Sequence, residues 1–145
     1  MEKKQKILFV QDMGAEKFEI ESIWCIKNGD NYTVANIPFI AKRISLGDTI
    51  KAEYDTAENA YYFDDFVAVS GNTTVRIYFE DEHIIEDIRH ELNDFGCSGE
   101  IFLSRKILAV NVPSSVDYFP IKKYLDNGEQ KAKWKYEESC LAHEY

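Results

Sequence analysis

The sequence predicts an α+β fold in which an N-terminal small curved β-sheet or partial barrel is followed by a ferredoxin-like βαββαβ unit. Before position 71, short β-rich segments alternate with turn residues, and no long stretch shows the 3.6-residue periodicity of a helix. After it, strand and helix patterns follow one another in the order β-α-β-β-α-β, the order of the split fold. We therefore expect two lobes, residues 1–71 and 72–145, packed as one compact unit.

Five strands are expected in the first lobe. They cover residues 7–10, 18–27, 32–36, 49–54 and 61–70. Asn28-Gly29-Asp30-Asn31 separates the second from the third, and these residue types tolerate the positive φ of a tight hairpin turn. A hairpin is predicted there. The pattern changes at Ser70-Gly71-Asn72-Thr73-Thr74, which marks the boundary between the lobes.

The second lobe begins with a strand over residues 74–79. A helix follows, because Ile84, Ile85, Ile88, Leu92 and Phe95 share one face and Gly96 can end it. Strands are predicted over residues 100–103 and 107–112. A second helix should cover residues 119–126, with Pro120 in its first turn and Asn127-Gly128 at its end. A last strand is expected over residues 132–138.

Charge is the main constraint on the partners. Twenty-six acidic residues against seventeen basic ones give a net charge of -9. Such a field repels phosphate backbones and anionic membrane surfaces, and it attracts basic proteins. We therefore expect a protein partner, no direct nucleic acid and no membrane. The alternative is that the negative charge serves only solubility. The oligomeric state is not fixed by these observations.

The termini and cysteines indicate a cytoplasmic protein. The apolar run behind the basic start covers only residues 7–10, too short for a signal peptide or a spanning helix. Cys25, Cys97 and Cys140 are odd in number and lack CxxC spacing, so reduced thiols are expected.

No cofactor or metal is expected from the motifs. Phosphate-loop and dinucleotide-binding patterns are missing from the sequence. His83 and His90 are seven residues apart on one predicted helix, about 10.5 Å at 1.5 Å per residue, too far for one ion. The protein is therefore predicted not to be an enzyme. The alternatives are a small hydrolase using Cys140 with His143 or a carboxylate pair, and a sensor with a ligand cleft between the lobes.

The strongest local feature is an acidic segment over residues 80–94. It contains seven carboxylates against Arg89 alone, a local charge of -6. The helix dipole favours acids in the first turn, but it disfavours Glu91 and Asp94 near the end. The segment is either a solvated face or a surface for a basic protein. On the second interpretation, the candidate contacts are Glu80, Asp81, Glu82, Glu86 and Asp87.

A second candidate surface interleaves tyrosines with acids over residues 61–66. In a regular strand, Tyr62, Asp64 and Phe66 would share one face, and Tyr61, Phe63 and Asp65 the other. Rings and carboxylates together suit an interface with a Lys- or Arg-rich partner. The alternative is an edge strand whose acids prevent pairing with other chains. The candidate contacts are Tyr61, Tyr62, Asp64 and Asp65.

A succession of short motifs resembles a bacterial family of domains of unknown function that is partly associated with toxin and immunity loci. The matching pieces are Asn36-Ile37-Pro38-Phe39, Leu46-Gly47-Asp48, Ser70-Gly71 with Thr74-Val75-Arg76, Gly96-Cys97 with Glu100, Val110-Asn111-Val112-Pro113, and Trp134-Lys135-Tyr136-Glu137-Glu138-Ser139-Cys140 with His143. The resemblance implies an immunity protein that binds and neutralises one cognate toxin domain, a basic nuclease, of a contact-dependent or other polymorphic toxin system.

Overall fold

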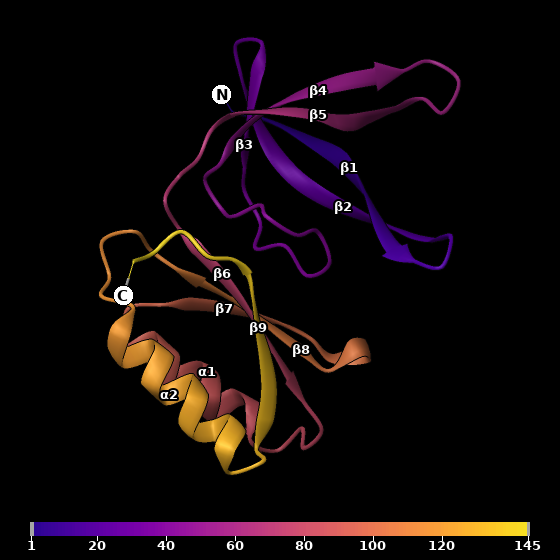
Figure 1. Ribbon diagram of the computed structural model, residues 1–145. Helices are drawn as coiled ribbons and strands as arrows, with labels where there is room; N and C mark the ends of the chain where they lie inside the picture. Colours follow the sequence, from indigo (N-terminus) through magenta and orange to yellow (C-terminus); the bar gives the residue numbers. More distant parts are fainter. Residues whose placement is uncertain (1, 145) are drawn as a thin grey trace. The chain divides into compact units, whose positions relative to one another are not determined.

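The protein has an α+β architecture made of two units. The computed structural model describes residues 2–144, and contacts divide the chain into Met1–Ser70 and Gly71–Tyr145 (Figure 1). Within residues 2–144 there are nine strands and two α-helices, and the strands form two sheets. The predicted α+β class is confirmed at this level.

The N-terminal unit is built from five strands. They are β1 (Lys3–Gly14), β2 (Lys17–Asn28), β3 (Asn31–Val34), β4 (Thr49–Asp55) and β5 (Ala60–Ala68). Neighbours in this order pair antiparallel, and a short parallel pairing of β1 with β5 closes the sheet. That closure rests on two residue pairs, Ile7 with Tyr61 and Leu8 with Tyr62.

Strands β1 and β2 form a long hairpin that the sequence analysis did not predict. Strand β1 has 12 residues instead of the expected four, because Ala15 and Glu16 turn the chain with φ of 52° and 60°. Residues with a Cβ rarely adopt this left-handed conformation, so a turn at Ala15 and Glu16 is not expected from their residue types. The predicted hairpin at Asn28-Gly29-Asp30-Asn31 is confirmed, with Gly29 at φ 64°.

Strand alternation places the core of this unit. Ile7, Phe9, Ile23 and Cys25 point inward and are at most 3% exposed. The long connection from β3 to β4 is held by a carboxylate, because Glu21 accepts the backbone N–H groups of residues 39–41 at 2.7, 2.9 and 2.7 Å.

The C-terminal unit follows the order strand, helix, strand, strand, helix, strand. Its elements are β6 (Thr73–Phe79), α1 (Ile85–Asp94), β7 (Ser98–Phe102), the 3₁₀ turn Leu103–Arg105, β8 (Ile107–Val112), α2 (Phe119–Gln130) and β9 (Trp134–Cys140). The sheet order is β7-β8-β6-β9, and every pairing is antiparallel.

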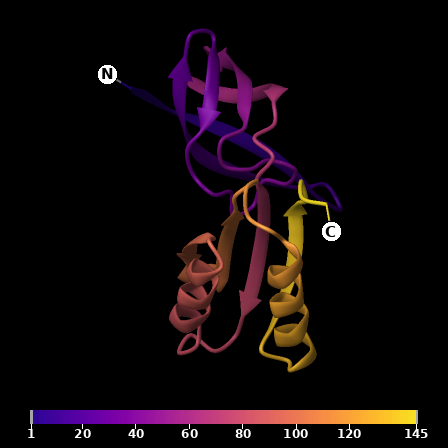
Figure 2. The ribbon, with the colours of Figure 1, turned by 90° about the vertical axis from the view of Figure 1, so that its left-hand side faces the viewer.

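Both helices pack on one face of this sheet (Figure 2). Alternate residues of the central strands, such as Val75, Ile77, Leu108 and Val110, form the core with the apolar stripes of the two helices. Pro120 lies in the first turn of α2, as predicted.

The end of α2 corrects the sequence prediction. The helix continues through Asn127-Gly128 to Gln130, so β9 begins at Trp134 rather than at residue 132. Gly128 is a packing residue rather than a helix end. A Cβ there would lie 1.8 Å from the Trp134 ring, so only glycine leaves room for the indole.

Candidate functional site

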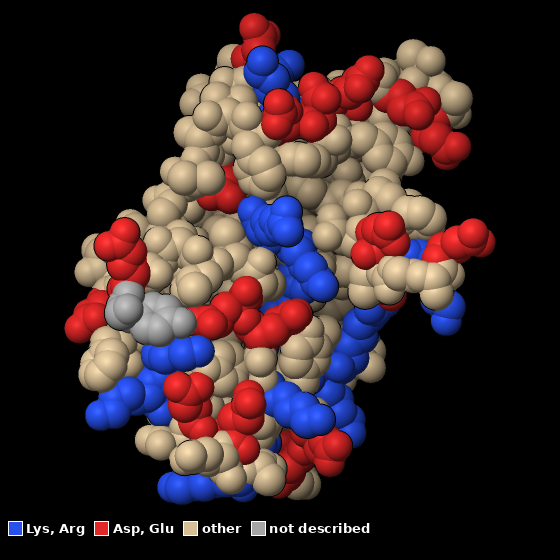
Figure 3. All heavy atoms as spheres, viewed as in Figure 1, with Lys and Arg blue, Asp and Glu red and all other residues tan. Residues whose placement is uncertain are grey.

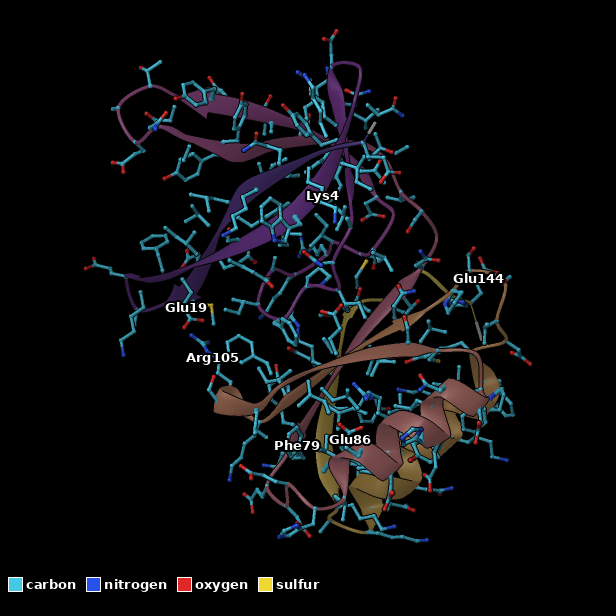
Figure 4. The ribbon with its side chains drawn as sticks, turned by 180° about the vertical axis from the view of Figure 1, so that it is seen from behind. Lys4, Glu19, Phe79, Glu86, Arg105 and Glu144 are labelled. Carbon is cyan, nitrogen blue, oxygen red and sulfur yellow. The ribbon has the colours of Figure 1, made fainter. Side chains whose placement is uncertain are left out.

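The acidic segment lies at and before helix α1. Ile85, Ile88 and Leu92 turn inward with at most 4% exposure, so the helix must direct its polar residues outward. Its first turn contains Glu86 and Asp87 and its last turn contains no basic residue. Figure 4 shows Glu86 on this helix.

A groove of about 610 Å³ lies beside the acidic face. Apolar and aromatic side chains of Ile84, Ile88, Tyr124 and Trp134 line it. The rings of Tyr124 and Trp134 lie 5.4 Å apart, and the Trp134 Nε1–H donates to the carbonyl of Leu125 at 3.1 Å. The aromatic lining is therefore fixed in position.

Charges of opposite sign line this groove. Glu80, Asp81, Asp87 and Glu91 come from the α1 segment, and Lys131 and Lys133 come from the turn after α2. Within residues 2–144 neither lysine side chain forms an ion pair with these acids. Figure 3 shows acidic and basic side chains in adjacent patches over the C-terminal unit.

Three acids of the segment have structural contacts. Glu86 pairs with Arg89 at 3.0 Å, and Asp81 accepts the backbone N–H of His83 at 2.9 Å. Glu91 accepts a hydrogen bond from the Tyr124 hydroxyl. Burial and this bond raise the pKa of Tyr124, so it remains a neutral donor.

The other four acids have no such partner. The side chains of Glu80, Glu82, Asp87 and Asp94 make no hydrogen bond or ion pair with any residue that the structure describes. Glu82 and Glu86 line a separate hollow of about 480 Å³ with Arg89. The five predicted contact residues of the acidic segment are therefore divided between two sites. Glu80, Asp81 and Asp87 line the groove, and Glu82 and Glu86 line the separate hollow.

The aromatic segment lies in the N-terminal unit on β5. Tyr61 and Phe63 pack against its core, and Tyr61 contacts the Tyr54 ring at 4.9 Å. The predicted division of faces is wrong beyond Phe63, because a bulge opposite Lys51 and Ala52 interrupts the alternation. Phe66 consequently contacts Phe63 at 5.1 Å.

The other predicted residues of this segment differ in exposure. Tyr62 is half-buried, and Asp64 and Asp65 are exposed.

The ring of His143, the predicted base beside Cys140, is held by two hydrogen bonds. Both ring nitrogens of His143 are engaged: Nε2 donates to the carbonyl of Pro113 at 2.8 Å, and Nδ1 bonds the Thr73 hydroxyl at 2.6 Å. Thr73 Oγ1 also accepts the backbone N–H groups of Ala142 and His143, at 3.0 and 3.1 Å. His143 therefore fastens the C-terminal segment to the sheet.

Two further properties concern metals and membranes. A search of residues 2–144 finds no group of three or more His, Cys, Asp or Glu arranged to hold a metal ion. None of the helices described is long and apolar enough to cross a membrane.

The other wall of the groove does not follow from the sequence pattern. Lys131, Lys133 and Trp134 form this wall, and the sequence pattern predicts only a strand over residues 132–138 there. The spacing of Gly128 from Trp134 could have indicated the packing between helix and strand, but only with the knowledge that α2 extends past residue 126.

The sequence matches a family described as a domain of unknown function (DUF4265) over residues 21–136. The chain belongs to the DUF4265 family. This confirms the expected membership of a domain-of-unknown-function family, and the association with toxin and immunity loci stays a prediction. A search of curated proteins gives no match to this DUF4265 protein.

A solved structure shares the fold of this DUF4265 protein. It is described as a novel crystal structure of a hypothetical protein from Neisseria gonorrhoeae. The TM-score is 0.80 at 22% identity, and the match covers 98% of each chain.

Proposed function

We propose that this DUF4265 protein is a non-catalytic immunity protein that binds and neutralises a basic toxin domain, a nuclease, in the cytoplasm. The supporting observation is the set of four carboxylates on the α1 segment, Glu80, Glu82, Asp87 and Asp94, whose side chains make no ion pair with a positive charge of the described chain. A basic partner would supply that charge.

Among these carboxylates, Asp94 acts against helix stability, because it lies at the C-terminal end of α1. Like charges one helical turn apart repel by a few tenths of a kcal/mol per pair, and an acid near the helix C-terminus opposes the dipole. Their repulsion is relieved when a cationic surface approaches. Complementary charge also speeds association, which benefits an inhibitor that must act before its toxin cuts.

The groove would add affinity to this electrostatic attraction. The exposed parts of Tyr124 and Trp134 offer rings against which a side chain of the toxin can stack. Lys131 and Lys133 would select for a partner segment with an acid beside its basic residues. In the proposal, Tyr61, Tyr62, Asp64 and Asp65 form a second contact set on the N-terminal unit.

Copurification with charge-matched variants tests the proposal. The tagged protein is isolated from its native host at low and high salt, and eluted proteins are identified by mass spectrometry. A stoichiometric basic partner encoded beside the gene is expected, retained by wild type and lost from the Glu80→Lys/Asp87→Lys variant. The control Glu58→Lys/Glu144→Lys changes net charge equally and should retain it. The proposal fails if the neighbouring toxin kills cells equally with and without this protein.

We also propose finer fold assignments. The order β7-β8-β6-β9 with two helices on one face supports a ferredoxin-like C-terminal unit. The two-pair contact of β1 with β5 supports a small, narrowly closed barrel at the N-terminus. The ferredoxin-like fold hosts many functions, so the fold alone does not determine the function of this protein.

A further inference from the structure

The outer face of the β1–β2 hairpin is an apolar surface with oppositely charged residues at its ends. Five cross-strand residue pairs, here called rungs, lie on this face. They run from Lys4 with Ile26 at one end to Asp12 with Phe18 at the other. The intermediate rungs are Lys6 with Trp24, Leu8 with Ser22, and Val10 with Ile20. Figure 4 shows Lys4 on β1.

This face exposes more apolar surface than the fold requires. Phe18 is 63% exposed, Ile20 54%, Val10 49% and Trp24 42%. The opposite face of the same ribbon already supplies the core residues Ile7, Phe9 and Ile23. Contiguous exposed apolar side chains bordered by charges are typical of binding surfaces.

Lysine groups are held over this face. The Lys6 ammonium lies 5.1 Å from the centre of the Trp24 ring, and Lys4 is on the neighbouring rung. Asp12, at the other end, accepts the backbone N–H of Gly14 at 2.9 Å and is exposed. The ribbon therefore runs from a basic end through an apolar middle to an acidic end.

Such a surface is complementary to its own copy in one orientation. When two ribbons meet face to face about a two-fold axis that crosses the strands at the Leu8 rung, Lys4 of each copy faces Asp12 of the other. The same operation sets Trp24 against Ile20 and Ile26 against Phe18. It also sets Lys6 against Val10, where the Lys6 ammonium keeps its contact with the Trp24 ring. A two-fold axis along the strands would instead set Asp12 against Phe18 and Lys4 against Ile26, so that neither end charge would face an opposite charge.

We propose that the outer face of the β1–β2 hairpin binds a second copy of this chain in the antiparallel arrangement. The five rungs extend over roughly 27 Å at about 3.4 Å per residue. Because a ribbon two strands wide buries less than the roughly 800 Å² per partner of a standard interface, the dimer is weak and depends on concentration.

Sedimentation velocity from micromolar to millimolar chain concentration tests this proposal. Wild type is expected to shift from monomer to dimer, and Ile20→Asp should weaken self-association by at least about tenfold, because it places a carboxylate in an apolar contact. Leu103→Asp is the matched control, since Leu103 is 52% exposed and lies in the other unit. Wild type that stays monomeric, or equal dimers from both variants, would overturn the proposal.

Charge reversal tests the orientation. Lys4→Asp gives a copy that is acidic at both ends, and Asp12→Lys gives one that is basic at both ends. Each alone should be monomeric, and an equal mixture should form a heterodimer with the summed charge of two wild-type chains. Asp12→Lys also removes the Gly14 hydrogen bond, so restoration in the mixture separates charge from hairpin damage. A mixture that stays monomeric would refute the antiparallel arrangement.

Discussion

The two units of the molecule use carboxylates in opposite ways. In the N-terminal unit, Asp48 is 2% exposed and accepts the backbone N–H groups of Ser45 and Ser70 at 2.9 and 2.8 Å. In the C-terminal unit, Asp87 and Asp94 have no hydrogen-bond or ion-pair partner among residues 2–144. A carboxylate that satisfies buried donors stabilises the fold. Asp94, at the C-terminal end of α1, instead opposes the helix dipole, and the side chains of both Asp87 and Asp94 are available to another molecule.

The largest effect that follows from this contrast is expected for Asp48→Ala. The substitution removes two charge-assisted hydrogen bonds from a buried site, so the free energy of unfolding should fall by roughly 3 kcal/mol. Urea unfolding followed by circular dichroism measures it. Asp64→Ala is the control, because Asp64 makes no hydrogen bond or ion pair with a described residue. Equal stability of the two variants would contradict a structural role for Asp48.

Gly128→Ala tests the lining of the groove. The new methyl group would lie 1.8 Å from the Trp134 ring, so the indole must move. Overpacking of this kind costs about 1–3 kcal/mol, partly offset by the better helix propensity of alanine. We expect a net loss of roughly 2 kcal/mol, measured by Trp134 fluorescence in a Trp24→Phe background. Asn127→Ala, on an exposed position of the same helix, should leave stability nearly unchanged.

Thiol reactivity compares the buried cysteines with Cys140. Burial raises the pKa of Cys25 to about 12 and that of Cys97 to about 11, from an ordinary value of 9.0. A thiol-reactive disulfide reagent at about pH 8 should therefore modify Cys140 in the native protein and all three cysteines after unfolding. Cys140→Ser should leave the native protein unreactive. Rapid native labelling of that variant would show that one of the buried thiols is accessible.

The raised pKa of Cys97 predicts how the stability of the protein changes at alkaline pH. Between about pH 9 and 11 the folded state keeps the Cys97 proton while the unfolded chain releases it. The stabilisation is fully present below pH 9 and is lost as pH rises through this window. Wild type should therefore be more stable than Cys97→Ala at neutral pH, and the difference between their unfolding midpoints should become smaller as pH rises toward 11.

The sequence predicted the features that depend on periodicity. The face of α1 with Ile85, Ile88 and Leu92 and the order of elements after residue 71 both follow from local patterns. The hairpin at residues 14–17 was missed because Ala15 and Glu16 adopt a conformation typical of glycine, which tertiary pairing of the long strands imposes.

The candidate site was predicted only in part for a similar reason. Its acids are visible as a run of charge in the sequence. The groove also needs the contact of Gly128 with Trp134, which joins a helix to a strand, and the bulge in β5 shifts Phe66 toward Phe63. These contacts depend on which surfaces meet, and no single stretch of sequence contains that information.

The smallest effect is expected for Asp94→Asn, which should stabilise the protein, whereas Asp48→Ala and Gly128→Ala destabilise it. Asp94 ends α1, where a negative charge opposes the helix dipole, and no cation pairs with it in the described chain. Its removal should raise the free energy of unfolding by about 0.5 kcal/mol. Glu86→Gln should lower stability by a similar amount, because it breaks the pair with Arg89 at 3.0 Å. Urea unfolding of both variants at low salt measures the difference, and added salt should reduce it. If Asp94→Asn were destabilising, Asp94 would be a stabilising residue of the fold like Asp48, and its availability to a basic partner would no longer follow.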